Sequence, residues 1–276
     1  MRSKSLMARL MSAPYVLWSV LFILAPLAFV LYYAFTDRNG SFTLGNIKQL
    51  GSASYADIFM RSASFALAAT AICLLVAYPL AYAVARAKPG SQKIYIMLIM
   101  LPMWMNLLIR TYSWMNILER NGIINNVLAG FGIEPLKMIG TPGAVILGMV
   151  YNYLPYMILP IYTVMSKLDI TLLEAADDLG ANAFQRLRTL VIPLSMPGVI
   201  SGITMVFVPS VSTFYISQKL GGGKIMLIGD AIERQIQQQY NYNLGASISL
   251  VLMVMILISM AIMNRFASDD AERLVV

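Results

Sequence analysis

An uncharged segment near the middle of the chain reads Pro142-Gly-Ala-Val-Ile-Leu-Gly-Met-Val-Tyr-Asn-Tyr-Leu-Pro-Tyr-Met-Ile-Leu-Pro-Ile-Tyr-Thr-Val-Met165. A helix that crosses a membrane needs about 20 mainly apolar residues, because each residue adds about 1.5 Å and the hydrocarbon layer is roughly 30 Å thick. This segment is long enough and contains no Asp, Glu, Lys or Arg. It is therefore predicted to form a membrane-spanning helix.

Other segments of similar length and composition lie on both sides of it. With the first one included, six spans are expected near residues 14–35, 62–85, 94–118, 142–165, 195–216 and 244–265. The composition agrees, since 59% of the 276 residues are hydrophobic and only 12% are charged, about half the charged share of an ordinary soluble domain. We expect an all-α polytopic membrane protein in which residues 1–276 form one transmembrane domain.

The residue types that most catalytic and metal sites require are missing or badly placed. The chain has no His and one Cys, which argues against an imidazole base, a His-ligated metal and an internal disulfide. It also lacks a Gly-x-Ser-x-Gly motif, and no acidic residue falls inside a predicted span. We expect no catalytic, metal or cofactor site in this chain.

The distribution of Lys and Arg predicts how the chain crosses the membrane. Twenty basic and 13 acidic residues give a net charge of +7, and the basic residues are spread out rather than clustered as in a nucleic-acid-binding patch. With the N-terminus inside, the inner segments hold eleven basic residues and the longer outer segments hold eight, as the positive-inside rule prefers. We expect both termini in the cytoplasm. The first apolar run exceeds the length of a signal peptide and is interpreted as a retained span.

The predicted inner loop, residues 167–193, begins with a helical pattern. Thr171 is followed three residues later by Glu174, a spacing typical of a capping box. This predicts a helix over about residues 171–179, and Gly180 should end it.

A second helical piece is expected over residues 182–190, and Pro193 should stop it where the fifth span begins. Together the two pieces predict a helix-turn-helix that lies along the membrane. The first piece presents small or apolar side chains beside acidic ones: Leu172, Leu173, Ala175, Ala176 and Leu179, with Glu174, Asp177 and Asp178. Such a surface suits a partner with basic residues. The alternative is a solvated interfacial helix in which Glu174 only caps its own N-terminus.

The same loop resembles a motif of the permease subunits of binding-protein-dependent ABC importers. That motif reads E-A-A-x3-G-x9-I-x-L-P, and this chain has Glu174-Ala175-Ala176, Gly180 and Leu190-Val191-Ile192-Pro193 at the same spacing. Leu190 and Ile192 fill the two apolar positions with side chains of the same size. Other segments are similar to the permease subunits of spermidine/putrescine importers, namely 101–112, 144–155, 167–169, 214–217, 221–224 and 227–229.

The resemblance implies a set of partners and a location. The partners are a second permease subunit, a dimeric ATPase subunit that binds ATP and Mg, and an extracellular or periplasmic polyamine-binding protein, all at a bacterial inner or cytoplasmic membrane. This chain has no phosphate-binding loop of its own, because Gly221-Gly-Gly-Lys224 precedes Ile225 and lacks the required spacing. The resemblance also implies that the loop is a coupling helix seated on the ATPase, with these residues: Glu174, Ala175, Ala176, Asp177, Gly180 and Pro193.

A polyamine would need a pathway without fixed negative charge, since the predicted spans contain no acidic residue. Aromatic faces and neutral oxygens can replace hydration of an ammonium group. We expect the pathway to draw on Trp104, Asn106, Arg110, Tyr151, Asn152, Tyr153, Phe214 and Tyr215. Tyr and Trp also form belts at membrane interfaces, a role that fits Tyr112, Trp114 and Tyr215 equally well.

Apart from Arg265 at the boundary of the sixth span, Arg110 is the only charged residue within a predicted span. Its position near the outer end of the third span favours a side chain that snorkels to the interface. The alternatives are an electrostatic gate or a clamp to an outer carboxylate such as Glu119.

Two other classes of protein share the six-span pattern. A self-contained secondary carrier or channel for small organic cations is one, although such carriers usually need charged residues at the membrane midplane. An intramembrane enzyme is the other, and the sequence offers it no catalytic constellation. Spermidine and putrescine cannot be distinguished from the sequence, because the binding protein largely selects the substrate.

Overall fold

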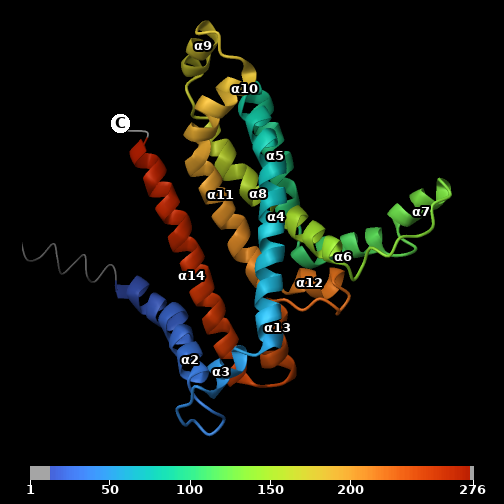
Figure 1. Cartoon of the computed structure of the whole chain (residues 1–276), viewed down its shortest axis with the longest axis vertical. Coiled ribbons are helices and arrows are strands. Elements are labelled where there is room, and N and C mark those ends of the chain that lie inside the picture. Colours follow the sequence, from blue (N-terminus) through green and yellow to red (C-terminus); the bar gives the residue numbers. More distant parts are fainter. Residues whose placement is uncertain (1–12, 274–276) are drawn as a thin grey trace, which may run out of the picture. The chain divides into compact units, whose positions relative to one another are not determined.

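The computed structural model describes residues 13–273, which are helical almost throughout (Figure 1). Extended pairing in that range is limited to one isolated bridge between Thr36 and Phe42. Five helices are long and apolar enough to cross a membrane, and a bent pair of helices makes up to six. The five are Ala13–Ala34, Ala53–Ala85, Pro142–Met165, Ala183–Ser212 and Tyr242–Met263. The prediction of a mostly helical protein with several apolar spans is confirmed.

In chain order the elements are η1 (Val20–Leu24), α2 (Ala25–Ala34), α3 (Gly45–Leu50), α4 (Ala53–Ala85), α5 (Pro89–Met100), η2 (Leu101–Trp104), α6 (Leu107–Leu118), α7 (Ile123–Gly130), α8 (Pro142–Met165), α9 (Ile170–Asp178), α10 (Ala183–Arg186), η3 (Leu187–Val191), α11 (Ile192–Ser212), α12 (Tyr215–Leu220), α13 (Ile228–Glu233), η4 (Arg234–Gln238) and α14 (Tyr242–Arg273).

The third span, expected over residues 94–118, is broken near its middle rather than continuous. The chain forms two helical segments, Pro89–Trp104 and Leu107–Gly130, which meet at an angle of 91°. Pro102 lies in the 3-10 turn η2, Met105 is extended, and the side chain of Asn106 accepts a hydrogen bond from the Leu108 N–H at 2.8 Å. Because Asn106 caps a new helix, the apolar run breaks there instead of continuing.

The fifth span also differs at its end. We expected it to reach residue 216, but α11 ends at Ser212 and Thr213 is extended. The short helix α12 then begins at Tyr215. Phe214 and Tyr215 therefore belong to a separate helical segment rather than to the span.

The described chain divides into two compact units. The first comprises residues 13–56 and 231–254, and the second comprises residues 57–230 and 255–273. In the first unit, the carbonyl groups at the C-terminal end of α2 have no partner within the helix. The Asn243 amide donates to the Thr36 carbonyl at 2.7 Å, and the Ser247 hydroxyl donates to the Ala34 carbonyl at 3.1 Å. These bonds join the end of α2 to the start of α14.

The second unit is built around the packing of α8 against α11, which lie side by side in Figure 1. Gly198 and Gly202, one turn apart on α11, face α8. A Cβ at Gly198 would collide with the Pro160 carbonyl, and one at Gly202 would collide with Met157. Small residues spaced in this way let two membrane helices approach closely.

Small side chains also let α4 pack closely in this unit. Ala77 and Ala81 are fully buried, as is Cys73, and all three join a core that includes Met157 and Ile161 of α8. Tyr153 of α8, which is considered below, also packs against this core.

Candidate functional site

The first helix of the loop between α8 and α11 begins at Ile170, one residue earlier than expected. Asp169 is the N-cap of α9, and its carboxylate accepts a hydrogen bond from the Thr171 N–H at 3.0 Å. The expected capping box of Thr171 and Glu174 is therefore wrong, because Asp169 already occupies the capping position. The Thr171 backbone N–H, aided by the Thr171 hydroxyl, lowers the pKa of Asp169 below its ordinary value.

Gly180 ends α9 in the way that the sequence indicates. Its φ is +81°, a left-handed conformation that favours glycine. The Gly180 N–H donates to the Asp177 carbonyl at 2.9 Å, and the Ala181 N–H donates to the Ala176 carbonyl at 3.0 Å. These two bonds form a Schellman motif, which satisfies the last carbonyl groups of the helix.

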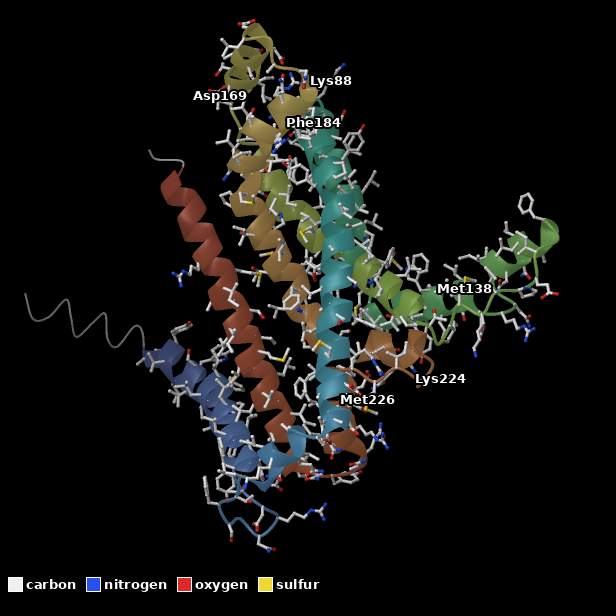
Figure 2. All side chains as sticks on the ribbon, in the orientation of Figure 1. Lys88, Met138, Asp169, Phe184, Lys224 and Met226 are labelled. Atoms are coloured by element: carbon white, nitrogen blue, oxygen red, sulfur yellow. The ribbon has the colours of Figure 1, made fainter. Side chains whose placement is uncertain are left out.

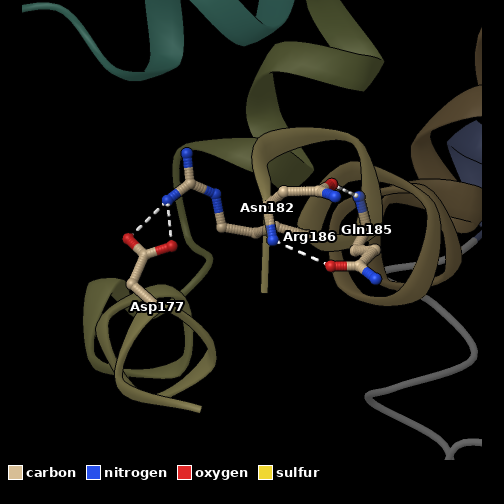
Figure 3. Close-up of polar contacts among 4 residues, drawn as sticks. All are labelled: Asp177, Asn182, Gln185 and Arg186. Carbon is tan, nitrogen blue, oxygen red and sulfur yellow. Dashed lines mark hydrogen bonds and ion pairs between the residues drawn. The ribbon is translucent and has the colours of Figure 1, made fainter. Parts of the chain in front are cut away.

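The next helix, α10, is capped and joined to α9 (Figure 3). Asn182 and Gln185 form a reciprocal capping box with two bonds of 2.9 Å. The Arg186 guanidinium bonds both oxygens of the Asp177 carboxylate, at 2.6 and 2.5 Å. The loop is therefore an ordered pair of helices, and Asp177 is engaged within it.

One face of this helix pair is left exposed. Leu173 and Ala176 of α9 are buried, whereas Glu174 and Ala175 are exposed. Leu179 at the end of α9 is 89% exposed, and Phe184 of α10 is 68% exposed. Figure 2 shows Asp169 and Phe184 at the same end of the second unit as Lys88, and Lys224 toward the other end. An exposed surface of this kind, with apolar and acidic side chains, is suited to bind another protein.

Pro193 does not stop the second helical piece, contrary to expectation. The helix runs from Ala183 to Ser212, with a π-turn over Leu187–Val191 in which the Ile192 N–H bonds the Leu187 carbonyl. Widening this turn accommodates a proline, which has no N–H and crowds the preceding turn. The α10 end of the loop is thus continuous with the membrane helix α11.

The aromatic candidates on α8 fall into different environments. The Tyr151 ring packs edge-on against Trp114 of α6, with centroids 5.3 Å apart. Tyr153 points toward α11, where its hydroxyl lies 3.4 Å from the Pro209 carbonyl. Asn152 is 2% exposed and donates to the Gly148 carbonyl, but its side-chain oxygen has no partner among the described residues.

Trp104 and Asn106 lie at the break between α5 and α6. Trp104 is 74% exposed, and Asn106 is exposed and spends its side-chain oxygen on capping α6. No ring contact joins Trp104 to the aromatic residues of α8 in the described part of the chain.

Arg110 is buried rather than snorkelling to the surface. Its side chain is 9% exposed, and its Nε and one terminal nitrogen find no hydrogen-bond partner among the described residues. The suggested clamp to Glu119 is also absent, since no ion pair joins Arg110 to Glu119. A guanidinium in this position is a strong local positive charge.

A second cluster forms where α12 packs on α6. The Lys219 ammonium lies 5.1 Å from the centre of the Tyr112 ring and 5.8 Å from that of Tyr215. The two rings meet edge to face at 6.3 Å. Phe214, the neighbouring candidate, is 43% exposed and outside this cluster. The sequence marks Tyr215 as a candidate but gives no sign of Lys219, because the contact depends on the turn at Thr213.

The described residues contain no group of three or more Cys, Asp or Glu side chains that could hold a metal ion.

Comparison with known protein families shows to which family this chain belongs. The family described as "Binding-protein-dependent transport system inner membrane component" matches residues 1–268. The chain belongs to this family. It is thus an inner-membrane transport component, and the loop motif that suggested the family lies inside the matched range.

Within this family, the chain is similar to permease proteins of spermidine/putrescine transport systems. The spermidine/putrescine transport system permease protein PotB of Haemophilus influenzae is 40% identical over 226 residues, which cover 79% of each chain. The PotB protein of Escherichia coli strain K12 is 37% identical over 79% of this chain and 82% of its own length.

A solved structure shares the fold of this inner membrane component. It is the bacterial alginate ABC transporter in complex with a periplasmic protein bound to an alginate pentasaccharide, and it aligns with a TM-score of 0.78 at 15% identity. The alignment covers 96% of this chain and 95% of the other. At this identity the likeness concerns the fold alone.

Proposed function

We propose that this chain is the permease subunit of an ATP-driven polyamine importer and forms half of the pathway for spermidine or putrescine. The observation that carries the proposal is the 40% identity, over 79% of both chains, to a permease protein of a spermidine/putrescine transport system. In this proposal residues 1–276 form one transmembrane domain with both termini in the cytoplasm. A second permease subunit completes the pathway, and a polyamine-binding protein delivers the substrate from outside.

The loop helices α9 and α10 are proposed to couple the pathway to a dimeric ATPase that binds ATP and Mg. Two features support this role. The exposed face with Glu174, Leu179 and Phe184 has no partner within the described chain, and the Arg186–Asp177 pair stiffens the loop so that it can transmit a push. The continuity of α10 with α11 gives that push a direct route into the membrane.

The proposed coupling residues divide by what they do. Glu174 and Ala175 face outward toward the ATPase. Ala176 packs inward, Asp177 holds Arg186, and Gly180 ends the helix. Pro193 marks the turn at which the loop joins the span.

The pathway is proposed to follow the aromatic side of α8. Tyr151 and Tyr153 offer ring faces, and Asn152 offers a buried oxygen without a hydrogen-bond partner in the described chain. Arg110 would limit how many ammonium groups can pass together, because like charges repel strongly where water is scarce. Trp104, Asn106, Phe214 and Tyr215 remain candidates for its outer part.

Purification of the assembled complex from its own membrane tests the coupling role. An affinity-tagged chain should retain an ATPase and a second six-span protein, identified by mass spectrometry. Glu174→Arg should release the ATPase, because it reverses a charge in the proposed contact. Glu134→Arg is the matched control, since Glu134 is exposed but lies outside the loop, and it should leave the complex intact.

Reconstitution tests the substrate. The purified complex, supplied with its binding protein, should accumulate labelled spermidine or putrescine in proteoliposomes only when ATP is present. Recovery of the chain alone, together with ATP-independent uptake, would contradict the importer and favour a secondary carrier or channel.

A further inference from the structure

The cluster of Tyr112, Tyr215 and Lys219 already holds an ammonium group in an aromatic cage. Both ring centres lie within 6 Å of the Lys219 nitrogen, which is the range of a cation–π contact. The rings meet edge to face at 6.3 Å, so they form two walls of one cage. Lys219 forms no ion pair with an acidic side chain anywhere in residues 13–273.

The wall of this cage that comes from α12 is fixed by packing. Tyr215 and Lys219 lie four residues apart on α12, whose Ile216 and Leu220 are fully buried. A Cβ at Gly148 of α8 would collide with both of these side chains, which shows how closely α12 is packed onto α8. Tyr112 comes from α6. Tyr215 is therefore held by the packing of α12, whereas Tyr112 is 42% exposed and the Lys219 stem is flexible and partly exposed.

The Lys219 side chain, which occupies the cage, is chemically equivalent to the end of a polyamine. A lysine side chain is a primary ammonium group on a four-carbon chain, and putrescine carries the same group at each end of four carbons. A neutral aromatic cage exchanges one alkylammonium for another without breaking a salt bridge. Two ammonium groups in the cage together would repel each other, so occupancy is exclusive.

We propose that the Tyr112–Tyr215 cage is a binding subsite for the primary ammonium end of the transported cation, and that Lys219 occupies it as an internal competitor until the cation displaces it. The identity of the cation rests on the proposed function. The subsite itself rests on the cage and its occupant.

Binding to the complete purified transporter, without its binding protein, tests the subsite. Equilibrium dialysis with labelled putrescine, and separately with n-butylammonium, gives dissociation constants for the wild type, Lys219→Gln, Tyr112→Leu and the double variant. Lys219→Gln should tighten binding about 2- to 5-fold, the factor that one cation–π contact at a partly exposed site supports. Tyr112→Leu should weaken it by a similar factor, and the double variant should match Tyr112→Leu.

The two variants are expected to change cation binding in opposite directions, and this distinguishes a Lys219 that competes with the cation from one that only holds α12 on α6. If Lys219 only ties α12 to α6, then Lys219→Gln and Tyr112→Leu should both leave binding unchanged or both weaken it, and either result overturns the proposal. Tyr112→Phe, which keeps the ring, should bind like the wild type. Lys219→Arg should weaken cation binding, because a guanidinium stacks well on aromatic rings; this provides the test if Lys219→Gln does not assemble.

The two failures are distinguishable. Wild-type uptake of spermidine or putrescine decides the proposed function, whereas the response of n-butylammonium binding to Lys219→Gln decides the subsite.

Discussion

Gly180 shows how one residue sets the geometry of the loop. Its φ of +81° places it in the left-handed region, and nothing lies within 4 Å of the position that a Cβ would take. A substitution there is therefore opposed by backbone conformation alone and not by a clash. The Schellman bonds from Gly180 and Ala181 to the end of α9 depend on that conformation.

Gly180→Ala should loosen the turn between α9 and α10. The left-handed conformation costs a residue with a side chain about 1–2 kcal/mol, so the amide groups of residues 176–182 should exchange hydrogen roughly 5- to 30-fold faster, as that free energy implies. Hydrogen-exchange mass spectrometry of the purified protein measures this. Gly90→Ala is the control, since Gly90 also has open space around its Cβ position but no positive φ. Equal exchange in both variants would contradict the role given to Gly180.

At the scale of elements, the loop is held together by one ion pair between two short helices. The Asp177 side chain is 50% exposed and that of Arg186 is 26% exposed. An ion pair with this exposure contributes at most about 1 kcal/mol. It orients α10 on α9, while burial of Leu173 and Ala176 anchors α9 itself.

Exchanging the two charges tests this orientation. Asp177→Arg and Arg186→Asp each place two like charges together, and each should reduce the ATPase activity that the binding protein stimulates in the complete complex. The double variant restores an opposite pair and should recover most of the lost activity. If Asp177 instead contacts the ATPase directly, the double variant should remain as defective as Asp177→Arg alone.

The same elements show what the sequence can and cannot predict. The bounds 142–165 of α8 follow from its own apolar side chains, and α8 has those bounds. The break after Trp104 does not follow, because it depends on competition between the hydrophobic run and the cap formed by Asn106. The capping of α9 by Asp169 and the passage of the helix past Pro193 do not follow from the sequence for a similar reason: each depends on which of several local hydrogen bonds forms.

Contacts between elements are harder still to predict. Tyr112 and Lys219 are more than 100 positions apart in the sequence, and they meet because α11 ends at Ser212 and α12 folds back onto α6. The burial of Arg110 has the same origin, since its surroundings come from other helices. A pattern within one span carries no information about such contacts.

For the whole molecule, the second unit places the loop and the Gly221–Lys224 turn at different ends. Figure 2 shows Phe184 at one end and Lys224 toward the other. Both side chains are exposed. If the helices between them cross the membrane, these two residues face different aqueous compartments, and the proposed topology puts Phe184 in the cytoplasm and Lys224 outside.

Cysteine labelling checks this topology in the assembled transporter. Cys73 is fully buried, so the unmodified chain should not react with a membrane-impermeant maleimide and serves as the background control. Lys224→Cys should react in intact spheroplasts, because its exposed position faces the medium. Phe184→Cys should react only after the membrane is permeabilised. Reaction of Phe184→Cys in intact spheroplasts would reverse the orientation, and the loop could then not reach a cytoplasmic ATPase.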